Sequence, residues 1–272
     1  MPADAKPLFR PDVLGPKVAA FPLPASATAR RPKLGQWAEL FASGRAERIK
    51  ESELLPDFLT DFFLGLLGYV GRVEGGDRYT FSREKHVEVD GKYADAVLGD
   101  FTADRQNFTI ALEGKGPRDP LDRPFAGRRM SAVDQGYRYA INLPCDWIIV
   151  TSMRQTRLYY KGAGQHTYER FDIERLAADE ATLRKFVFLL GAERVTQATG
   201  KCHLYDLLAA SEKVGRDVTK EFYVNYADLR HDTFLDLCQA NPEVPPSDVL
   251  TATQKALAVC GFLTYSILRQ RA

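Results

Sequence analysis

Three charged residues are spaced so that they could hold a metal ion at one end of a β-sheet. Glu113 and Lys115 end the segment "FTIALEGKG" (108–116), in which Phe, Ile and Leu alternate with other residues. This period of two is typical of a strand, and residues two apart lie on the same face. Asp95 lies in the preceding apolar segment "YADAVLG" (93–99). If the two strands are neighbours, Asp95 approaches Glu113 and Lys115.

Two carboxylates and a lysine are the groups that metal-assisted phosphodiester hydrolysis requires. Carboxylate oxygens bind hard divalent cations such as Mg²⁺, and the bound metal polarises a phosphoryl oxygen and lowers the pKa of a water. Lys115 would orient the attacking water or stabilise charge in the transition state. A surface ion pair is the alternative, because a chain with 27% charged residues contains such spacings by chance.

The helix predicted over 128–143 carries two further polar groups. Gln135 and Tyr139 are four residues apart and therefore share one helix face. They can hold a metal-bound water, a backbone phosphate or the lysine by hydrogen bonds. The alternative is an ordinary helix surface with an amphipathic tyrosine.

The segment between the predicted strand and this helix is rich in arginine. Its arginines could hold a DNA backbone beside a metal ion, although the interleaved Asp119 and Asp122 are equally typical of a solvated loop. These arginines are Arg118, Arg123, Arg128 and Arg129. The histidines His86, His166, His203 and His231 are scattered, and we expect structural or surface roles for them. We expect Trp37 and Trp147 to be packing residues.

The periodicities around these residues predict an α/β fold, with a mixed central sheet flanked by helices and followed by an all-α segment. Residues 36–69 are helical in pattern, and Pro56 should start or kink that helix. The later elements follow in the order β-β-β-α-β-β-α. The predicted strands are 78–89, 92–101, 106–115, 146–153 and 156–162, and the predicted helices are 128–143, 176–195, 203–240 and 246–268.

The first 35 residues differ from the rest in composition. They contain seven of the 15 prolines, and they have a local net charge of +4. Because proline disfavours helix interiors and sheet ladders, we expect an extended basic arm. Such an arm could lie along a phosphate backbone, or it could be a solvated tail.

The overall composition excludes several classes of protein. The net charge is +1, so any basic surface must be local. The four cysteines are widely spaced without a CxxC pair, which indicates reduced thiols in a cytoplasmic protein and neither a zinc site nor a disulfide framework. No apolar run of about 18 residues predicts a membrane span, so we expect no membrane partner.

The segments "ADAVLG", "ALEGKGPRDPLD" and "AVDQGYRYA" together resemble the core of PD-(D/E)xK nucleases with their QxxxY helix. More specifically, they resemble the amino-terminal nuclease module of type IIG restriction–modification enzymes, single chains that join DNA cleavage and methylation. "KESELLPDFLTDFFLGLLGY" resembles the helix that opens this module, whose glutamate joins the metal site; Glu51 matches it better than Glu53. "EFYVNYADLR" and "TQKALAVCGFLTYSILRQR" resemble the helical connector that precedes the methyltransferase.

The resemblance implies a nuclease domain over 36–200 and a helical connector over 201–272. It implies an endonuclease that cuts double-stranded DNA with Mg²⁺, for which Mn²⁺ should substitute, in restriction-based defence. Asp95, Glu113 and Glu51 would be metal ligands, Lys115 would position water, and Gln135 and Tyr139 would support the site. Water would attack the phosphorus in line and expel the 3′ oxygen, leaving a 5′ phosphate. A transient dimer on DNA would supply two active sites.

The chain contains no FxGxG cofactor loop and no NPPY-type tetrapeptide. We therefore expect the methyltransferase and target-recognition modules outside this chain, whether it is a fragment, a truncated gene or a separate subunit. One alternative is a catalytically inactive DNA-binding or docking scaffold with the same fold. Another is a nuclease of a different defence or repair system.

Overall fold

The computed structural model describes residues 5–87, 92–125, 127–197 and 202–257. Asp90 and Gly91, which join the first two predicted strands, and Cys260 lie outside these ranges. Contacts divide the chain into two units, residues 1–211 and residues 212–272. Among the described helices, none is both long and apolar enough to cross a membrane.

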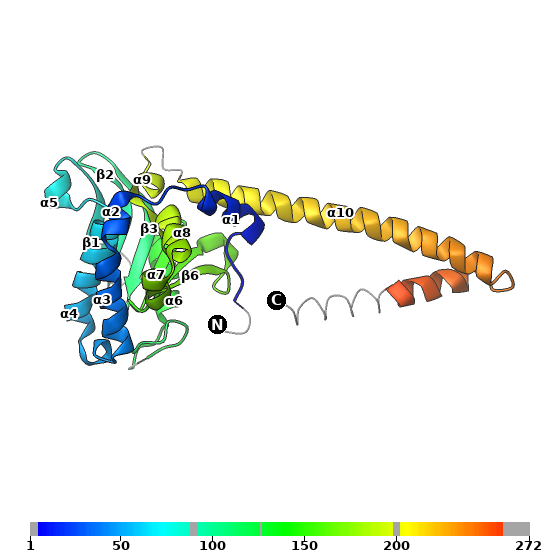
Figure 1. Cartoon of the computed structure of the whole chain (residues 1–272), viewed down its shortest axis with the longest axis horizontal. Helices are drawn as coiled ribbons and strands as arrows, with labels where there is room; N and C mark the ends of the chain where they lie inside the picture. Colours follow the sequence, from blue (N-terminus) through cyan, green and yellow to red (C-terminus); the bar gives the residue numbers. More distant parts are fainter. Residues whose placement is uncertain (1–4, 88–91, 126, 198–201, 258–272) are drawn as a thin grey trace. The chain divides into compact units, whose positions relative to one another are not determined.

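The first unit is built on a six-stranded mixed sheet with helices packed on it (Figure 1). The strands lie in the sheet in their order along the chain, and only β3 and β4 run parallel. These strands are β1 (Arg78–Val87), β2 (Lys92–Thr102), β3 (Gln106–Gly114), β4 (Trp147–Thr151), β5 (Gln155–Tyr160) and β6 (Tyr168–Asp172). The α/β class and the first five strands are confirmed, whereas β6 was not predicted.

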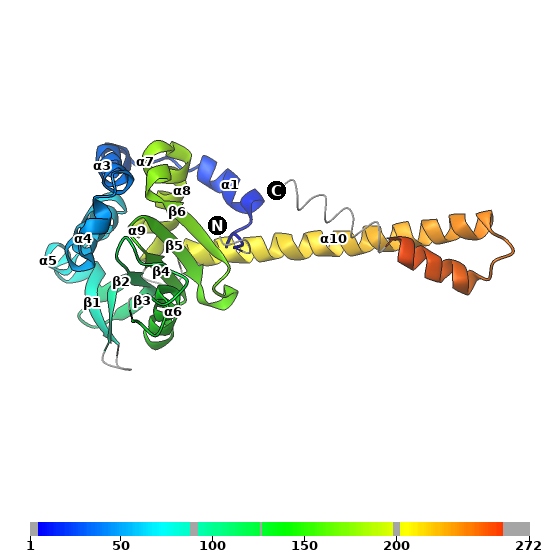
Figure 2. The same ribbon diagram turned by 90° about the horizontal axis from the view of Figure 1, so that it is seen from below.

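The two faces of β3 pack against different helices. Ile110 and Leu112 belong to a large core shared with α4 (Glu51–Phe58) and η2 (Leu59–Leu66). Ala111 belongs to a smaller core with α6 (Ala132–Asn142), the crossover helix between β3 and β4. The predicted alternation is confirmed for Ile110, Ala111 and Leu112, whereas Phe108 packs against the smaller core, beyond a β-bulge between Leu98 and Gly99 of β2. Figure 2 shows α4 and α6 on opposite sides of the sheet.

The prediction of an extended arm over residues 1–35 is wrong. This segment forms α1 (Pro11–Ala19), α2 (Ala25–Ala29) and the start of α3 (Arg31–Ala42), and Phe9, Leu14 and Leu34 are buried in the core. Prolines occupy the first turns of α1 and α3. A backbone N–H in the first turn has no acceptor within the helix, so its absence in proline costs no hydrogen bond. Counting prolines without their positions therefore missed these helices.

Pro56 lies inside α4, which begins five residues earlier at Glu51. The α-helical pattern gives way to the π-helix η2 at Leu59, one turn after the proline. Thr60 Oγ1 donates a hydrogen bond to the Pro56 carbonyl oxygen at 2.8 Å. Glu51 and Leu55 remain one turn apart on the helix face that meets β3.

The remaining elements complete both units. The helix predicted over 176–195 is divided into α7 (Ile173–Ala178), α8 (Glu180–Leu190) and α9 (Ala192–Val195). Short elements are η1 (Ala46–Arg48), α5 (Arg72–Gly75) and η3 (Lys161–Ala163). The predicted helix 203–240 is confirmed as α10 (His203–Ala240), whose residues 212–240 belong to the second unit. The next helix is described over 246–257, and residues 258–268 of its predicted range lie outside the described part.

Gly136 allows α6 to approach the sheet closely. A Cβ atom at this position would lie 2.8 Å from Ile148 Cγ2 and 3.0 Å from Val150 Cγ2. We expect Gly136→Ala to lower the free energy of unfolding by about 1–3 kcal/mol, because the added methyl group overpacks this contact. Urea unfolding of the full chain measures the change.

The matched control is Gly35→Ala in the middle of α3, where an added Cβ would meet nothing within 4 Å. Alanine has the higher helix propensity, so this variant should gain about 0.5–1 kcal/mol. An unchanged unfolding midpoint for Gly136→Ala would contradict the close packing of α6.

Candidate active site

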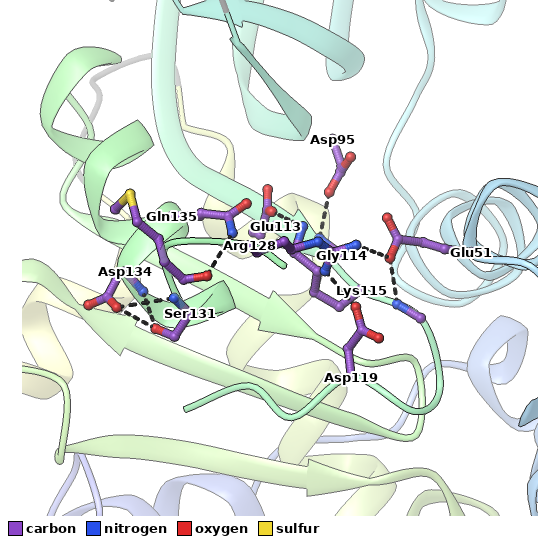
Figure 3. A network of polar contacts seen from close by, with 12 residues as sticks. Glu51, Asp95, Glu113, Gly114, Lys115, Asp119, Arg128, Ser131, Asp134 and Gln135 are labelled. Carbon is purple, nitrogen blue, oxygen red and sulfur yellow. Dashed lines mark hydrogen bonds and ion pairs between the residues drawn. The ribbon is translucent and has the colours of Figure 1, made fainter. Parts of the chain in front are cut away.

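Three successive backbone amides hold the end of β3 to three different elements, and Figure 3 shows the contacts with Asp95 and Glu51. Gly114 N–H donates to Asp95 Oδ2 of β2 at 2.7 Å, and Lys115 N–H donates to the carbonyl oxygen of Thr151 on β4 at 2.8 Å. Gly116 N–H donates to Glu51 Oε2 of α4 at 2.7 Å. Two of the predicted acidic residues therefore fix the backbone around Lys115.

The absence of a side chain at Gly114 lets α4 reach this strand end. A Cβ atom on Gly114 would lie 2.5 Å from Leu55 Cδ1. Glu51 precedes Leu55 by one helical turn, so the same contact brings its carboxylate to Gly116. The small residues in "LEGKG" are thus the local reason why a helix and two strands meet here.

Glu113 and Lys115 form an ion pair on the other face of β3. Both side chains are buried, with Glu113 2% and Lys115 6% exposed. Helix α6 lies over them, since a Cβ atom on Gly136 would lie 3.9 Å from Glu113 Cβ. The alternative of an exposed surface ion pair is therefore wrong for these two residues.

The acidic pair holds its protons more tightly than free carboxyl groups do. Burial is the main cause that raises the pKa of Glu113 to about 8; the negative charge of Asp95 adds to the rise, and Lys115 opposes it. Burial also raises the pKa of Asp95, against the Gly114 N–H and Lys115, which lower it. One lysine does not fully compensate two neighbouring carboxylates in this environment.

Asp95 and Glu113 fit a hard divalent cation, because they offer oxygen ligands in a place with excess negative charge. Mg²⁺ commonly binds through one or two carboxylates and completes its shell with waters and substrate phosphates. Among the described residues, however, no three His, Cys, Asp or Glu side chains are close enough to hold an ion together. The pair of Asp95 and Glu113, and not a group of three such residues, is therefore the candidate metal site.

Glu51 lies at the same strand end but outside this pair. Its Oε2 accepts the Gly116 N–H and lies 3.5 Å from Arg128 Nη2. Its negative charge nevertheless contributes to the raised pKa values of Asp95 and Glu113. The role of Glu51 as a ligand stays a prediction, and the less favoured Glu53 is exposed on α4.

Helix α6 places Gln135 and Tyr139 near the acidic pair. The helix begins with a capping box in which Ser131 and Asp134 satisfy each other's backbone N–H groups. Gln135 Nε2 donates to the Met130 carbonyl oxygen at 3.3 Å. Tyr139 is buried, and the pKa of its hydroxyl is raised by burial and by the charges of Glu113 and Asp95. The tyrosine is therefore within electrostatic range of the pair.

Sequence reasoning missed the ion pairs that organise the loop between β3 and α6. Arg128 Nη1 lies 2.5 Å from Asp119 Oδ2. Arg157 of β5 is buried and binds Asp122 in a bidentate manner, with 2.5 Å from Nη1 to Oδ1 and 3.0 Å from Nη2 to Oδ2. The one available signal was an arginine inside the apolar strand segment "TRLYY".

The other candidate residues lie apart from the site. Trp37 and Trp147 are buried, which confirms their packing role. His203 is partly buried, and burial lowers the pKa of its imidazole to about 4. Cys145, Cys202 and Cys238 are free thiols.

Comparison of the chain with protein-family models, with curated proteins and with solved structures gives no match. The function must therefore be inferred from the residues and the geometry of the site.

The buried carboxyl group of Glu113 makes stability depend on pH. The folded protein releases this proton near pH 8, whereas the unfolded chain releases it near 4.5. Between these values the folded state binds the extra proton, so the free energy of unfolding of the metal-free protein falls as pH rises. We expect Glu113→Gln to flatten this decrease, which chemical denaturation from pH 4.5 to 8 measures.

The matched control is Glu53→Gln, an exposed position on α4. It should keep the wild-type pH dependence. If Glu113→Gln shows the same slope as wild type, Glu113 ionises normally in the folded protein.

Proposed function

We propose that this chain is a Mg²⁺-dependent endonuclease module that hydrolyses phosphodiester bonds of double-stranded DNA in a restriction–modification system. One observation carries the proposal: Asp95 and Glu113 lie together on paired strands, with Lys115 against Glu113. The order of the motifs along the chain, D…ExK…QxxxY, supports it. The fold alone does not establish activity.

The acidic pair would hold the cation, with Glu51 as a candidate additional ligand. A bound divalent ion supplies charge stabilisation at the phosphate and a more acidic water. Lys115 has three donors, of which Glu113 takes one. The others can orient a water or a phosphate oxygen, and burial under α6 strengthens these contacts.

Gln135 and Tyr139 on α6 would position a phosphate or a water by hydrogen bonds. Tyr139 lies within range of the acidic pair, and Gln135 occupies the same helix face one turn earlier. Both can donate hydrogen bonds to a phosphate or to a water beside the strand end. Three exposed arginines in the loop between β3 and α6 would bind phosphates of the DNA backbone. They are Arg118, Arg123 and Arg129.

A catalytically inactive docking module is the second candidate. It is favoured by exposed apolar side chains on the part of α10 that belongs to the second unit, among them Val218, Phe222 and Leu229. In either case a methyltransferase or target-recognition partner would cover such a surface.

Calorimetric titration with Mn²⁺ tests the metal site without DNA. We expect Asp95→Asn to weaken binding by on the order of tenfold or more, because it removes one of the two charges while keeping the acceptor for Gly114 N–H. The matched control is Asp57→Asn, an exposed position on α4, which should bind as wild type does.

Equal binding by wild type and Asp95→Asn would place the metal elsewhere. Absence of binding by the wild-type chain at millimolar Mn²⁺ would favour the inactive module.

Cleavage of supercoiled plasmid DNA with Mg²⁺ tests the lysine. Lys115→Met should lower the cleavage rate by about 10²–10³-fold, the cost of removing a donor that stabilises transition-state charge. Lys50→Met, at an exposed position before α4, is the control and should cut at the wild-type rate. Unchanged cleavage by Lys115→Met would exclude its catalytic role.

A further inference from the structure

Arg128 bridges two carboxylates beside the candidate metal site. Its Nη1 lies 2.5 Å from Asp119 Oδ2, and its Nη2 lies 3.5 Å from Glu51 Oε2 (Figure 3). The side chain is 37% exposed, so solvent reaches the guanidinium. The guanidinium of Arg128 therefore already lies beside Glu51, the carboxylate that the family resemblance assigns to the metal site.

The two contacts of Arg128 differ in strength. The 2.5 Å contact with Asp119 is a direct charge-assisted hydrogen bond, whereas 3.5 Å to Glu51 is mainly a Coulomb attraction. The Glu51 oxygen concerned also accepts the Gly116 N–H. A metal ion near Glu51 would face the positive charge of Arg128 at short range, and like charges in a partly buried place repel each other. Metal and arginine therefore compete for Glu51.

The loop that carries Asp119 is anchored independently of Arg128. Arg157 holds Asp122 through two hydrogen bonds, and Leu121 is buried. Val133 N–H of α6 donates to the Leu121 carbonyl oxygen at 3.1 Å. Asp119 thus has a fixed place, and it would keep Arg128 at the site after the Glu51 contact is lost.

We propose that Arg128 is a DNA-phosphate-binding residue that the metal-free protein holds on Glu51 and that metal binding releases toward the DNA backbone. This inference rests on the proposed nuclease function and adds a positioning residue to it. A guanidinium has five N–H donors, so the Asp119 contact leaves donors for a bidentate contact with a phosphate. Metal binding and DNA binding are thereby coupled through one side chain.

The first test is calorimetric titration of the full chain with Mn²⁺ in the absence of DNA. Arg128→Ala should bind Mn²⁺ about two- to fivefold more tightly than wild type, the range expected for removing one partly exposed competing charge. Arg128→Lys keeps the charge and should bind close to wild type. Arg48→Ala is the control and should bind Mn²⁺ as wild type does, since this side chain in η1 is exposed and the described part of the structure shows no ion pair for it.

The second test is the affinity for a short DNA duplex as a function of salt, measured with Ca²⁺, which also takes oxygen ligands. Arg128→Ala should weaken binding and lower the salt slope by about one, as expected for one lost phosphate contact. Without a divalent ion, where Glu51 retains the arginine, the same substitution should have a smaller effect. Unfolding midpoints of all variants confirm that they are folded.

The Mn²⁺ and DNA titrations distinguish the role of Arg128 from the proposed metal-dependent activity. If wild type binds Mn²⁺ and Arg128→Ala binds it no more tightly, the competition is refuted while the metal site stands. If the effect of Arg128→Ala on DNA binding is the same with and without Ca²⁺, the release is refuted. If no variant binds Mn²⁺, both proposals fall.

Discussion

The burial of Glu113 against Lys115 at the end of β3 is the interaction on which the rest of the structure depends. Removing charged groups from water costs several kcal/mol per ion, and mutual attraction offsets this only when further polar partners are present. Asp95 on β2 interacts favourably with Lys115 but unfavourably with Glu113, and helix α6 covers Glu113. The raised pKa of Glu113 shows that the offset is incomplete. Carboxyl groups that bind a proton because positive charge is lacking around them are suited to a divalent cation in its place, which is the physical basis of the proposed function.

Close contacts on both faces of the sheet make this burial possible. Gly114 admits Leu55 of α4 on one face, and Gly136 brings α6 against Ile148 and Val150 on the other. The strand end is therefore enclosed between two helices, which lowers the local dielectric response and strengthens every charge interaction there. The contact between Gly114 and Leu55 also brings Glu51, one helical turn earlier, to Gly116. The packing of α4 against the strand end therefore also positions the negative charge of Glu51.

Ion pairs connect the loop between β3 and α6 to strand β5 and to helix α4 at the site. Arg157 fixes Asp122, while Asp119 and Glu51 share Arg128. The sequence pattern around these aspartates is typical of a solvated loop, because it does not show that Asp122 pairs with Arg157 of β5 or that Arg128, the partner of Asp119, also faces Glu51 of α4. Their pairing turns a polar segment into an ordered one, and it leaves other exposed arginines in the loop for a polyanion.

Features that depend on local periodicity and spacing could be predicted from the sequence. They include β2, β3 and the helix of Gln135 and Tyr139, because side-chain alternation and helical repeats are properties of neighbouring residues. The helices within residues 5–35, strand β6 and the partners of Glu51 could be found only in the folded structure. Each of these depends on contacts between distant segments: the segment that contains the first helices buries Phe9 and Leu14 in a core built largely by later elements, and Glu51 meets Gly116 and Arg128 across 65 and 77 positions. Such contacts leave no periodic trace in the sequence, because they are selected by packing and charge in three dimensions.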